Sequence, residues 1–134
     1  MQNTATHAIG ASFELTEEQK AVREAARDFA QNVLKPGVIE RDREQRFPKD
    51  EIRQLGELGF LGMMVSPEYG GGGMDAVSYV LAMEEISKVD ASCSVVMSVN
   101  NSLVCWGLET FGNEEQKRKY LVPLAKGEVI GAFC

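Results

Sequence analysis

Apolar residues along this 134-residue chain recur mostly every three or four positions, the spacing of one face of an α-helix. The first such segment begins at Thr16-Glu-Glu-Gln19, a capping box in which the Thr16 and Gln19 side chains each accept a free backbone N–H. Pro36 is expected to end this helix or to send the chain in a new direction. The apolar positions expected on its buried side are Val22, Ala25, Ala26, Phe29, Val33 and Leu34.

Five further segments carry helical periodicity or helix-start signals. Proline, glycine or an N-capping residue bounds each of them, as is typical of helix ends. Their expected ranges are residues 38–43, 49–58, 75–88, a helix that begins at Asp90 or Ser92 and extends to 109, and 114–125. The spacing predicts inward positions at Ile52, Leu55 and Leu58 in the second of these helices, and at Val80, Met83 and Ile86 in the third.

An apolar linker and a glycine-rich loop separate the second and third of these helices. We expect the linker, residues 60–65, to be buried because it is almost wholly apolar. The loop from Ser66 to Gly73 contains four consecutive glycines, but no Gly-Lys-Ser/Thr follows them, which excludes a P-loop. We interpret the loop as a turn that lets Asp75 cap the next helix.

The run from Ala91 to Leu108 contains no charged residue, which predicts a helix that is buried on nearly every side. Its 18 residues are almost enough to span a bilayer. Six serine and asparagine side chains in the run favour a core helix over a membrane span, so we expect no membrane contact. If the helix is central, Asn100, Asn101 and Ser102 must find hydrogen-bond partners.

The chain closes with residues 128–134, which are rich in residues that favour strands. The pattern therefore predicts an all-α bundle of five or six helices over residues 13–127, preceded by a disordered tail at residues 1–12. Residues 128–134 are expected to begin a β domain, the rest of which is missing from this truncated chain. Because the loss of further domains would expose apolar helix surface, we expect the chain to self-associate.

Net charge and the numbers of histidine and cysteine residues exclude several classes of partner and site. The net charge of −6 argues against nucleic acid, because phosphate binding needs a basic surface that releases counterions. The single histidine, His7, lies in the polar tail, which argues against a zinc site and against a Ser-His-Asp triad. Three cysteines without a CxxC motif indicate a reducing compartment, with Cys93 and Cys105 as buried apolar side chains. No secretory signal is present, so we expect the bacterial cytoplasm, or the mitochondrial matrix for a processed eukaryotic chain.

Glu84 and Glu85 form the one pair of acidic neighbours that suggests acid–base chemistry in the middle of a helix. Neighbouring residues on a helix point about 100° apart, so these two carboxylates cannot face each other across a substrate. At most one of them can turn inward. We expect a solvated or structural role for both and assign no catalytic residue in this chain.

Seven short motifs then follow one another in a characteristic order. They are Leu15-Thr-Glu-Glu-Gln19, Gly59-Phe-Leu-Gly62, Pro67-Glu-Tyr-Gly-Gly71, Met83-Glu-Glu-Ile86, Phe111-Gly-Asn-Glu-Glu-Gln-Lys117, Pro123-Leu-Ala-Lys-Gly127 and Gly131-Ala-Phe-Cys134. With this order and spacing, the chain from Phe13 to Cys134 resembles the N-terminal helical domain of the acyl-CoA dehydrogenase family. The segment Met97-Ser-Val-Asn-Asn-Ser-Leu103 resembles the short-chain, butyryl-CoA-type members in particular.

The resemblance implies an FAD-dependent enzyme that removes two hydrogens from the α and β carbons of an acyl-CoA and passes electrons to an electron-transferring flavoprotein. Members are usually homotetramers in which a middle β domain and a C-terminal helical domain follow the N-terminal helices. Phe133 and Cys134 match the opening of the family's first flavin-binding segment. The catalytic glutamate belongs to the C-terminal domain, so this chain alone is expected to be inactive.

The helix that carries Val95, Val96, Val99 and Leu103 matches the one that lines the acyl chain in the family. Val95, Val99 and Leu103 fall at i, i+4 and i+8 and form one apolar stripe. Two interpretations of the stripe stay open, an acyl-binding wall and an ordinary core face. Two other functions also stay open: a non-catalytic helical interaction module, and an acyl-CoA oxidase or flavin monooxygenase of the same fold.

Overall fold

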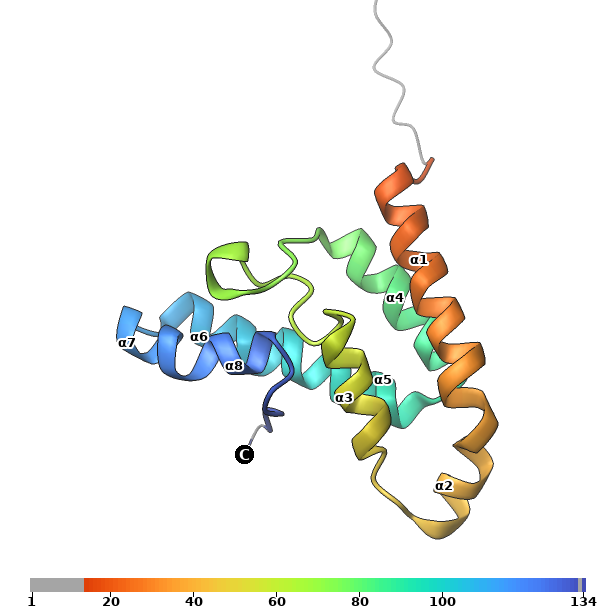
Figure 1. Ribbon diagram of the computed structural model, residues 1–134. Helices are drawn as coiled ribbons and strands as arrows, with labels where there is room; N and C mark the ends of the chain where they lie inside the picture. Colours follow the sequence, from red (N-terminus) through yellow and green to blue (C-terminus); the bar gives the residue numbers. More distant parts are fainter. Residues whose placement is uncertain (1–13, 133) are drawn as a thin grey trace, which may run out of the picture.

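The computed structural model describes residues 14–132 and 134, and the regular structure among them is entirely helical (Figure 1). The principal α-helices are α1 (Glu17–Phe29), α2 (Val38–Glu44), α3 (Lys49–Glu57), α4 (Ala76–Ser87), α5 (Ala91–Ser98), α6 (Trp106–Phe111), α7 (Glu114–Gln116) and α8 (Val122–Ala125). Several of these join end to end through π-helical or 3-10 turns: η1 (Ala30–Leu34), η2 (Lys35–Gly37), η4 (Val99–Cys105) and η5 (Lys117–Leu121). A separate 3-10 turn, η3 (Pro67–Tyr69), lies in the glycine-rich loop. The described residues thus form five continuous helical stretches, which confirms the predicted all-α bundle.

The helix starts lie where the capping signals predicted them. Thr16 and Gln19 form the expected reciprocal pair, with N–H to oxygen distances of 3.2 and 3.0 Å. Asp75 Oδ1 accepts the Ser78 N–H at 2.7 Å and so caps α4. These bonds satisfy backbone N–H donors that have no partner inside the helix. Because both partners lie within three residues of each other, the helix starts could be predicted from local sequence.

Pro36 marks the expected boundary between two helices, because η1 ends at Leu34 and α2 begins at Val38. It lies in the 3-10 turn η2, and α2 continues directly from that turn. Proline lacks a backbone N–H, but the first positions of a helical turn do not use that donor within the helix. The helical winding therefore continues through Pro36.

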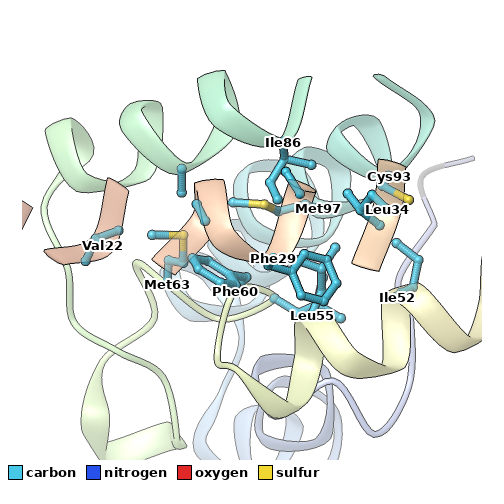
Figure 2. Packing of buried hydrophobic residues seen from close by; sticks show 14 residues of the cluster. Val22, Phe29, Leu34, Ile52, Leu55, Phe60, Met63, Ile86, Cys93 and Met97 are labelled. Atoms are coloured by element: carbon cyan, nitrogen blue, oxygen red, sulfur yellow. The ribbon is translucent and has the colours of Figure 1, made fainter. Parts of the chain in front are cut away.

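The first hydrophobic core lies between α1, α3, α4 and α5 and is closed by the linker after α3 (Figure 2). Helix α1 packs along α4, α4 packs against α5, and α3 also contacts α5. The predicted linker is buried, although Met64 within it is only partly covered. The core residues are Val22, Ala26, Phe29, Ala30, Leu34, Ile52, Leu55, Phe60, Leu61, Met63, Ala82, Ile86, Cys93 and Met97.

A second, smaller core lies where η4 and α6 pack against η5 and α8. Its buried residues are Val65, Tyr69, Cys105, Leu121, Leu124 and Ala125. The continuous helix of residues 91–111 contributes to both cores, with Met97 in the first and Cys105 in the second. This long helix therefore joins the two packed regions.

Three predicted inward positions are wrong, and one of them is Ala25 in α1, whose side chain is exposed. Val80 is 59% exposed and Leu58 is 58% exposed. Helix α4 instead buries a face that includes the small residues Ser78 and Ala82, because it packs closely between α1 and α5. Leu58 follows the last residue of α3, so its side chain lies beyond the packed face of that helix.

The long helix is not buried on nearly every side, as its lack of charge had predicted. Only 33% of the apolar window in Ala91–Phe111 is buried, and Val95, Leu103 and Trp106 are each at least half exposed. Other helices cover one side of it and leave an apolar side open. Among the described residues, this helix has the length to cross a membrane and a mean hydropathy of 1.2, which is apolar enough to do so. Length and composition are the two properties on which this statement rests.

The expected strand after Gly127 is not formed in the described residues 128–132. A strand requires a neighbouring strand for its backbone hydrogen bonds, and the described part of the chain provides none for this segment. The expected tail at residues 1–12 lies outside the described residues.

Replacing Met97 by alanine should lower the free energy of unfolding by about 2–5 kcal/mol, because it opens a cavity in the first core. The same truncation at Val95, two residues away and 60% exposed, should cost about 0.5 kcal/mol or less. Urea unfolding followed by circular dichroism measures both. Equal losses for Met97→Ala and Val95→Ala would contradict this assignment of buried and open sides.

Candidate functional site

The open side of the long helix carries a continuous apolar stripe. Val95 is 60% exposed, Leu103 is 50% exposed, and Val99 between them is partly exposed. Val96, also predicted to face a substrate, is partly buried and packs against the first core. The stripe is therefore not part of either core within the described residues.

Two exposed aromatic side chains lie further along the same helix than the predicted residues. Trp106 is 55% exposed and Phe111 is 77% exposed, and their rings meet edge to face with centroids 5.7 Å apart. Eleven residues separate Trp106 from Val95, about three turns of an ordinary α-helix, but the π-helical stretch η4 lies between them and changes the direction of Trp106. A hollow of about 390 Å³ adjoins this end of the helix and is lined by Val104, Gly107, Leu108, Phe111, Gly112, Gln116 and Tyr120.

Behind the stripe lies Asn100, which is fully buried. Its Nδ2 group donates to the carbonyl oxygens of Leu61 at 2.7 Å and Leu124 at 3.2 Å. Its Oδ1 atom accepts the backbone N–H of Gly131 at 2.9 Å. One side chain thus binds three segments that are far apart in the sequence.

Asn101 is buried beside it and binds the linker after α3. Its Nδ2 group donates to the carbonyl oxygens of Phe60 at 2.8 Å and Met97 at 2.9 Å, and its Oδ1 atom accepts the Met63 N–H at 2.9 Å. Both asparagines thus have the hydrogen-bond partners that the sequence required. Ser102 has one as well, because its hydroxyl donates to the carbonyl of Ser98 at 2.8 Å.

The helix is wound as a π-helix where these asparagines lie, in η4. The N–H of Trp106, directly after it, donates to the carbonyl of Asn101, five residues earlier. Side chains take up carbonyl groups in this region, since Asn101 binds that of Met97 and Ser102 binds that of Ser98. Insertion of side chains into the backbone ladder is a recognised cause of such local rewinding.

The segment after α8 lies against the same helix. A methyl group on Gly131 would come within 2.7 Å of a Val104 side-chain methyl, so only glycine fits there without displacement. Beyond Gly131, Ala132 and Cys134 are exposed. Phe133, predicted with Cys134 to begin a flavin-binding segment, lies outside the described residues.

Glu85 is the one of the two neighbouring glutamates that turns inward. Its carboxylate is buried and receives hydrogen bonds from Arg23 at 2.9 Å, Arg27 at 3.2 Å and Lys88 at 3.1 Å. The bond from Arg27 is the main cause that lowers the pKa of Glu85 from 4.5 to about 2, although burial opposes the shift. Glu84 is exposed and pairs with Lys88 at 3.0 Å, so only one of the two carboxylates turns inward, as predicted.

A second buried ion cluster holds the start of the long helix. The Arg41 guanidinium donates to Asp90 at 2.9 Å, to Glu51 at 2.8 Å and to the Leu34 carbonyl at 2.8 Å. Burial opposes charge on Asp90, but its bonds to Arg41 and to the Cys93 N–H keep its pKa below the ordinary value. Arg41 and Asp90 also line a cleft of about 620 Å³.

The sequence carried no sign of this cluster. Residues 40–44 alternate in charge, which is typical of a helix surface in water. A buried arginine looks the same in sequence as an exposed one, and only the packing of α2 against its neighbours distinguishes them.

Cys93 and Cys105 are buried, as predicted. Burial raises the pKa of each thiol to about 12, so neither is ionised near neutral pH. Since the thiolate is the reactive form, these two cysteines are packing residues.

The sequence of this chain matches a known protein family. A family model described as "Acyl-CoA dehydrogenase, N-terminal domain" matches residues 16–128. The chain belongs to the acyl-CoA dehydrogenase family. The long helix with its apolar stripe and the two buried asparagines lies wholly inside the matched region.

Among curated acyl-CoA dehydrogenases, the short-chain specific enzyme of Clostridium acetobutylicum is 48% identical over 90% of this chain and 32% of its own length. The mitochondrial short-chain specific enzyme of Bos taurus is 42% identical over 96% of this chain and 31% of its own length. The chain thus spans about a third of the length of the relatives it matches.

Solved structures give the same result. Butyryl-CoA dehydrogenase from Megasphaera elsdenii aligns with a TM-score of 0.83 and 38% identity, over 89% of this chain and 32% of that chain. A chain solved in work on the electron transferring flavoprotein of Acidaminococcus fermentans aligns with a TM-score of 0.86 and 44% identity, over 89% of this chain and 31% of that chain. The all-α N-terminal domain of the acyl-CoA dehydrogenases is therefore the fold of this chain.

The Glu85 cluster predicts acid sensitivity with a defined sign. Because folding lowers the pKa of Glu85 from 4.5 to about 2, its stabilisation is fully present above pH 4.5 and is lost as the pH falls towards 2. Glu85→Gln should be less stable than the parent at pH 7, and the difference should shrink between pH 5 and pH 2. Glu84→Gln is the matched control on the exposed side. A gap between Glu85→Gln and the parent that does not depend on pH would disprove the assignment.

The apolar stripe predicts self-association of the isolated chain, because exposed apolar side chains lower their free energy by pairing. Light scattering should give a mass above that of the monomer, and Leu103→Glu should shift it towards the monomer. Leu58→Glu, at a similarly exposed leucine away from the stripe, should leave the mass unchanged. A monodisperse monomer from the unsubstituted chain would refute the prediction.

Proposed function

We propose that this domain works within an FAD-dependent acyl-CoA dehydrogenase that desaturates a short-chain acyl-CoA, with Val95, Val99 and Leu103 lining the acyl chain. The observation that carries the proposal is an uncharged helix whose apolar stripe stays open while its opposite side is anchored in two cores. Val96, which packs partly against the core, supports the wall from behind. The short-chain names of the relatives in the comparison support the same substrate class.

An alkyl chain suits this surface chemically. Each methylene that leaves water for an apolar contact contributes about 0.8 kcal/mol, so a few methylenes against the stripe are a substantial part of substrate affinity. β-branched valines have few side-chain conformations and so present a stiff wall. A stiff wall that fills space close to the helix favours a short acyl chain over a long one.

The segment at residues 129–134 suits the edge of a flavin site. Val129 and Ile130 are 49% and 42% exposed, and Cys134 is also exposed, so these described residues offer open apolar surface to a planar ligand. We assign Phe133 and Cys134 to that edge. FAD, when bound, supplies the electron acceptor for the reaction.

The general base is not assigned to any residue of this chain. Glu85 is held in ion pairs and Glu84 points to solvent on α4, so neither is available to take a proton from a substrate on the stripe. We therefore propose that the 134-residue chain alone is inactive and that the complete enzyme supplies the base from another domain.

Partners follow from the same proposal. We infer that the complete enzyme passes electrons to an electron-transferring flavoprotein and assembles as a homotetramer. The reducing compartment suggested by the buried thiols fits the bacterial cytoplasm, or the mitochondrial matrix for a eukaryotic parent. The relatives named above include one bacterial and one mitochondrial enzyme.

A chimera tests the proposal directly. Residues 14–134 replace the aligned segment of the short-chain specific enzyme of Clostridium acetobutylicum, to which 121 residues of this chain align at 48% identity. The purified chimera should be yellow and should oxidise butyryl-CoA with an artificial electron acceptor. A folded, flavin-loaded chimera that does not oxidise butyryl-CoA would overturn the proposal.

Within this chimera, Val99→Ala should shift chain-length preference upward. Removing two methyl groups makes room for about one more methylene, so kcat/KM for pentanoyl-CoA relative to butyryl-CoA should rise about fourfold, from about 0.8 kcal/mol per methylene. Val80→Ala, a truncation at an exposed valine on α4, is the control and should leave the ratio unchanged. An unchanged ratio for Val99→Ala would count against an acyl wall at this residue.

A further inference from the structure

We propose that Asn100 is a positioning residue that fixes residues 129–132, the described start of the flavin-side segment, against the helix whose open side carries the acyl stripe. This inference rests on the proposed function, because it assigns a task within that reaction. It concerns a buried side chain that contacts neither substrate nor flavin. Its role is to set the distance between the surfaces that do.

The geometry of the amide carries the inference. The carbonyl oxygen of the Asn100 side chain accepts the Gly131 N–H at 2.9 Å, two residues before Phe133. The amino group of the same side chain donates to the carbonyls of Leu61 and Leu124, in two other segments. These donor bonds hold the amide in one orientation, so the position of Gly131 is fixed by a side chain that cannot rotate freely.

A second, independent contact fixes the same point. Gly131 lies so close to Val104 that an added Cβ would come within 2.7 to 2.8 Å of three Val104 side-chain atoms. Asn100 and Val104 are four residues apart, so the segment lies across one turn of the long helix. Hydrogen bonding and close packing therefore place the segment at the same level of the helix.

The hydrogen bond between Asn100 and Gly131 lies next to the acyl-facing residue Val99. Val99, on the partly exposed acyl-facing side, directly precedes Asn100 in the chain. The acyl wall and the flavin-side segment are thus linked through one residue and one hydrogen bond. Reaction between two bound groups needs approach to about 3–3.5 Å, and a displacement of about 1 Å can cost about a hundredfold in rate.

Asn101 supplies a matched control. It is 2% exposed, lies in the same π-helical stretch and also makes three hydrogen bonds, but its partners are Phe60, Met63 and Met97. Loss of its amide should destabilise the fold much as loss of the Asn100 amide does. Only the Asn100 variant should release the flavin-side segment.

The first measurement is amide hydrogen exchange on the 134-residue chain. The Gly131 N–H, compared with core amides of the same sample, should exchange at least about tenfold faster in Asn100→Ala than in Asn101→Ala, because only the former loses the acceptor. Gly131 exchange that is equally fast in both variants would overturn the proposed contact. This readout requires neither flavin nor activity.

The second measurement uses the chimera loaded with FAD. Asn100→Ala should weaken FAD binding and lower kcat by about tenfold or more, while KM for butyryl-CoA stays within about threefold, because the acyl wall itself is intact. Asn101→Ala should change FAD affinity and kcat much less. Gly131→Ala, which lies outside both cores and tests the same contact from the other side, should reproduce the Asn100→Ala defect even if that variant folds poorly.

The outcomes separate the two proposals. A flavin-loaded, active chimera in which Asn100→Ala and Gly131→Ala leave FAD affinity and kcat unchanged overturns the positioning role alone. Equal losses in Asn100→Ala and Asn101→Ala, with Gly131→Ala unaffected, also overturn it and indicate general destabilisation. An unsubstituted chimera that binds flavin but does not oxidise butyryl-CoA overturns the proposed function, and the positioning role falls with it.

Discussion

The packing of this domain depends on two buried primary amides in adjacent positions of one helix. An unsatisfied amide in an apolar interior is costly, so Asn100 and Asn101 constrain every segment that must supply their partners. Those partners are backbone groups from the linker after α3, from the end of α8 and from the segment that follows it. Neither core alone holds these segments in register. The amides lie where the two cores meet and fix one against the other.

This arrangement leaves the long helix with two different sides. One side carries the polar anchors and the core residues Met97 and Cys105, and the other carries exposed valine, leucine and tryptophan. A single domain of this size has too few helices to cover both sides of a 21-residue rod. The open side is thus available to a ligand or to another domain, which a fully enclosed core helix is not.

Local chemistry explains what could be predicted from the sequence. Capping residues such as Thr16 and Asp75 act on backbone within three positions, so the helix starts needed no tertiary information. The sequence also required partners for the two asparagines, but their identity depends on which segments pack together. Ala25, Val80 and Leu58 were misjudged, and the burial of Arg41 was missed, for the same reason: only the positions of neighbouring helices decide whether a side chain is covered. The motifs identified the family, and so the candidate stripe, more securely than periodicity did.

The π-helical stretch η4 holds more residues per turn than an α-helix, so it can accommodate an inserted residue. Deleting one residue between Val99 and Cys105 would allow ordinary α-helical winding, and the residues from Trp106 onward would keep nearly the same direction. Deleting one residue from α5 or α6 would instead rotate all that follows by about 100°. A one-residue gap in an alignment of relatives is therefore tolerated within η4, whereas in α5 or α6 it would signal a reoriented half-helix.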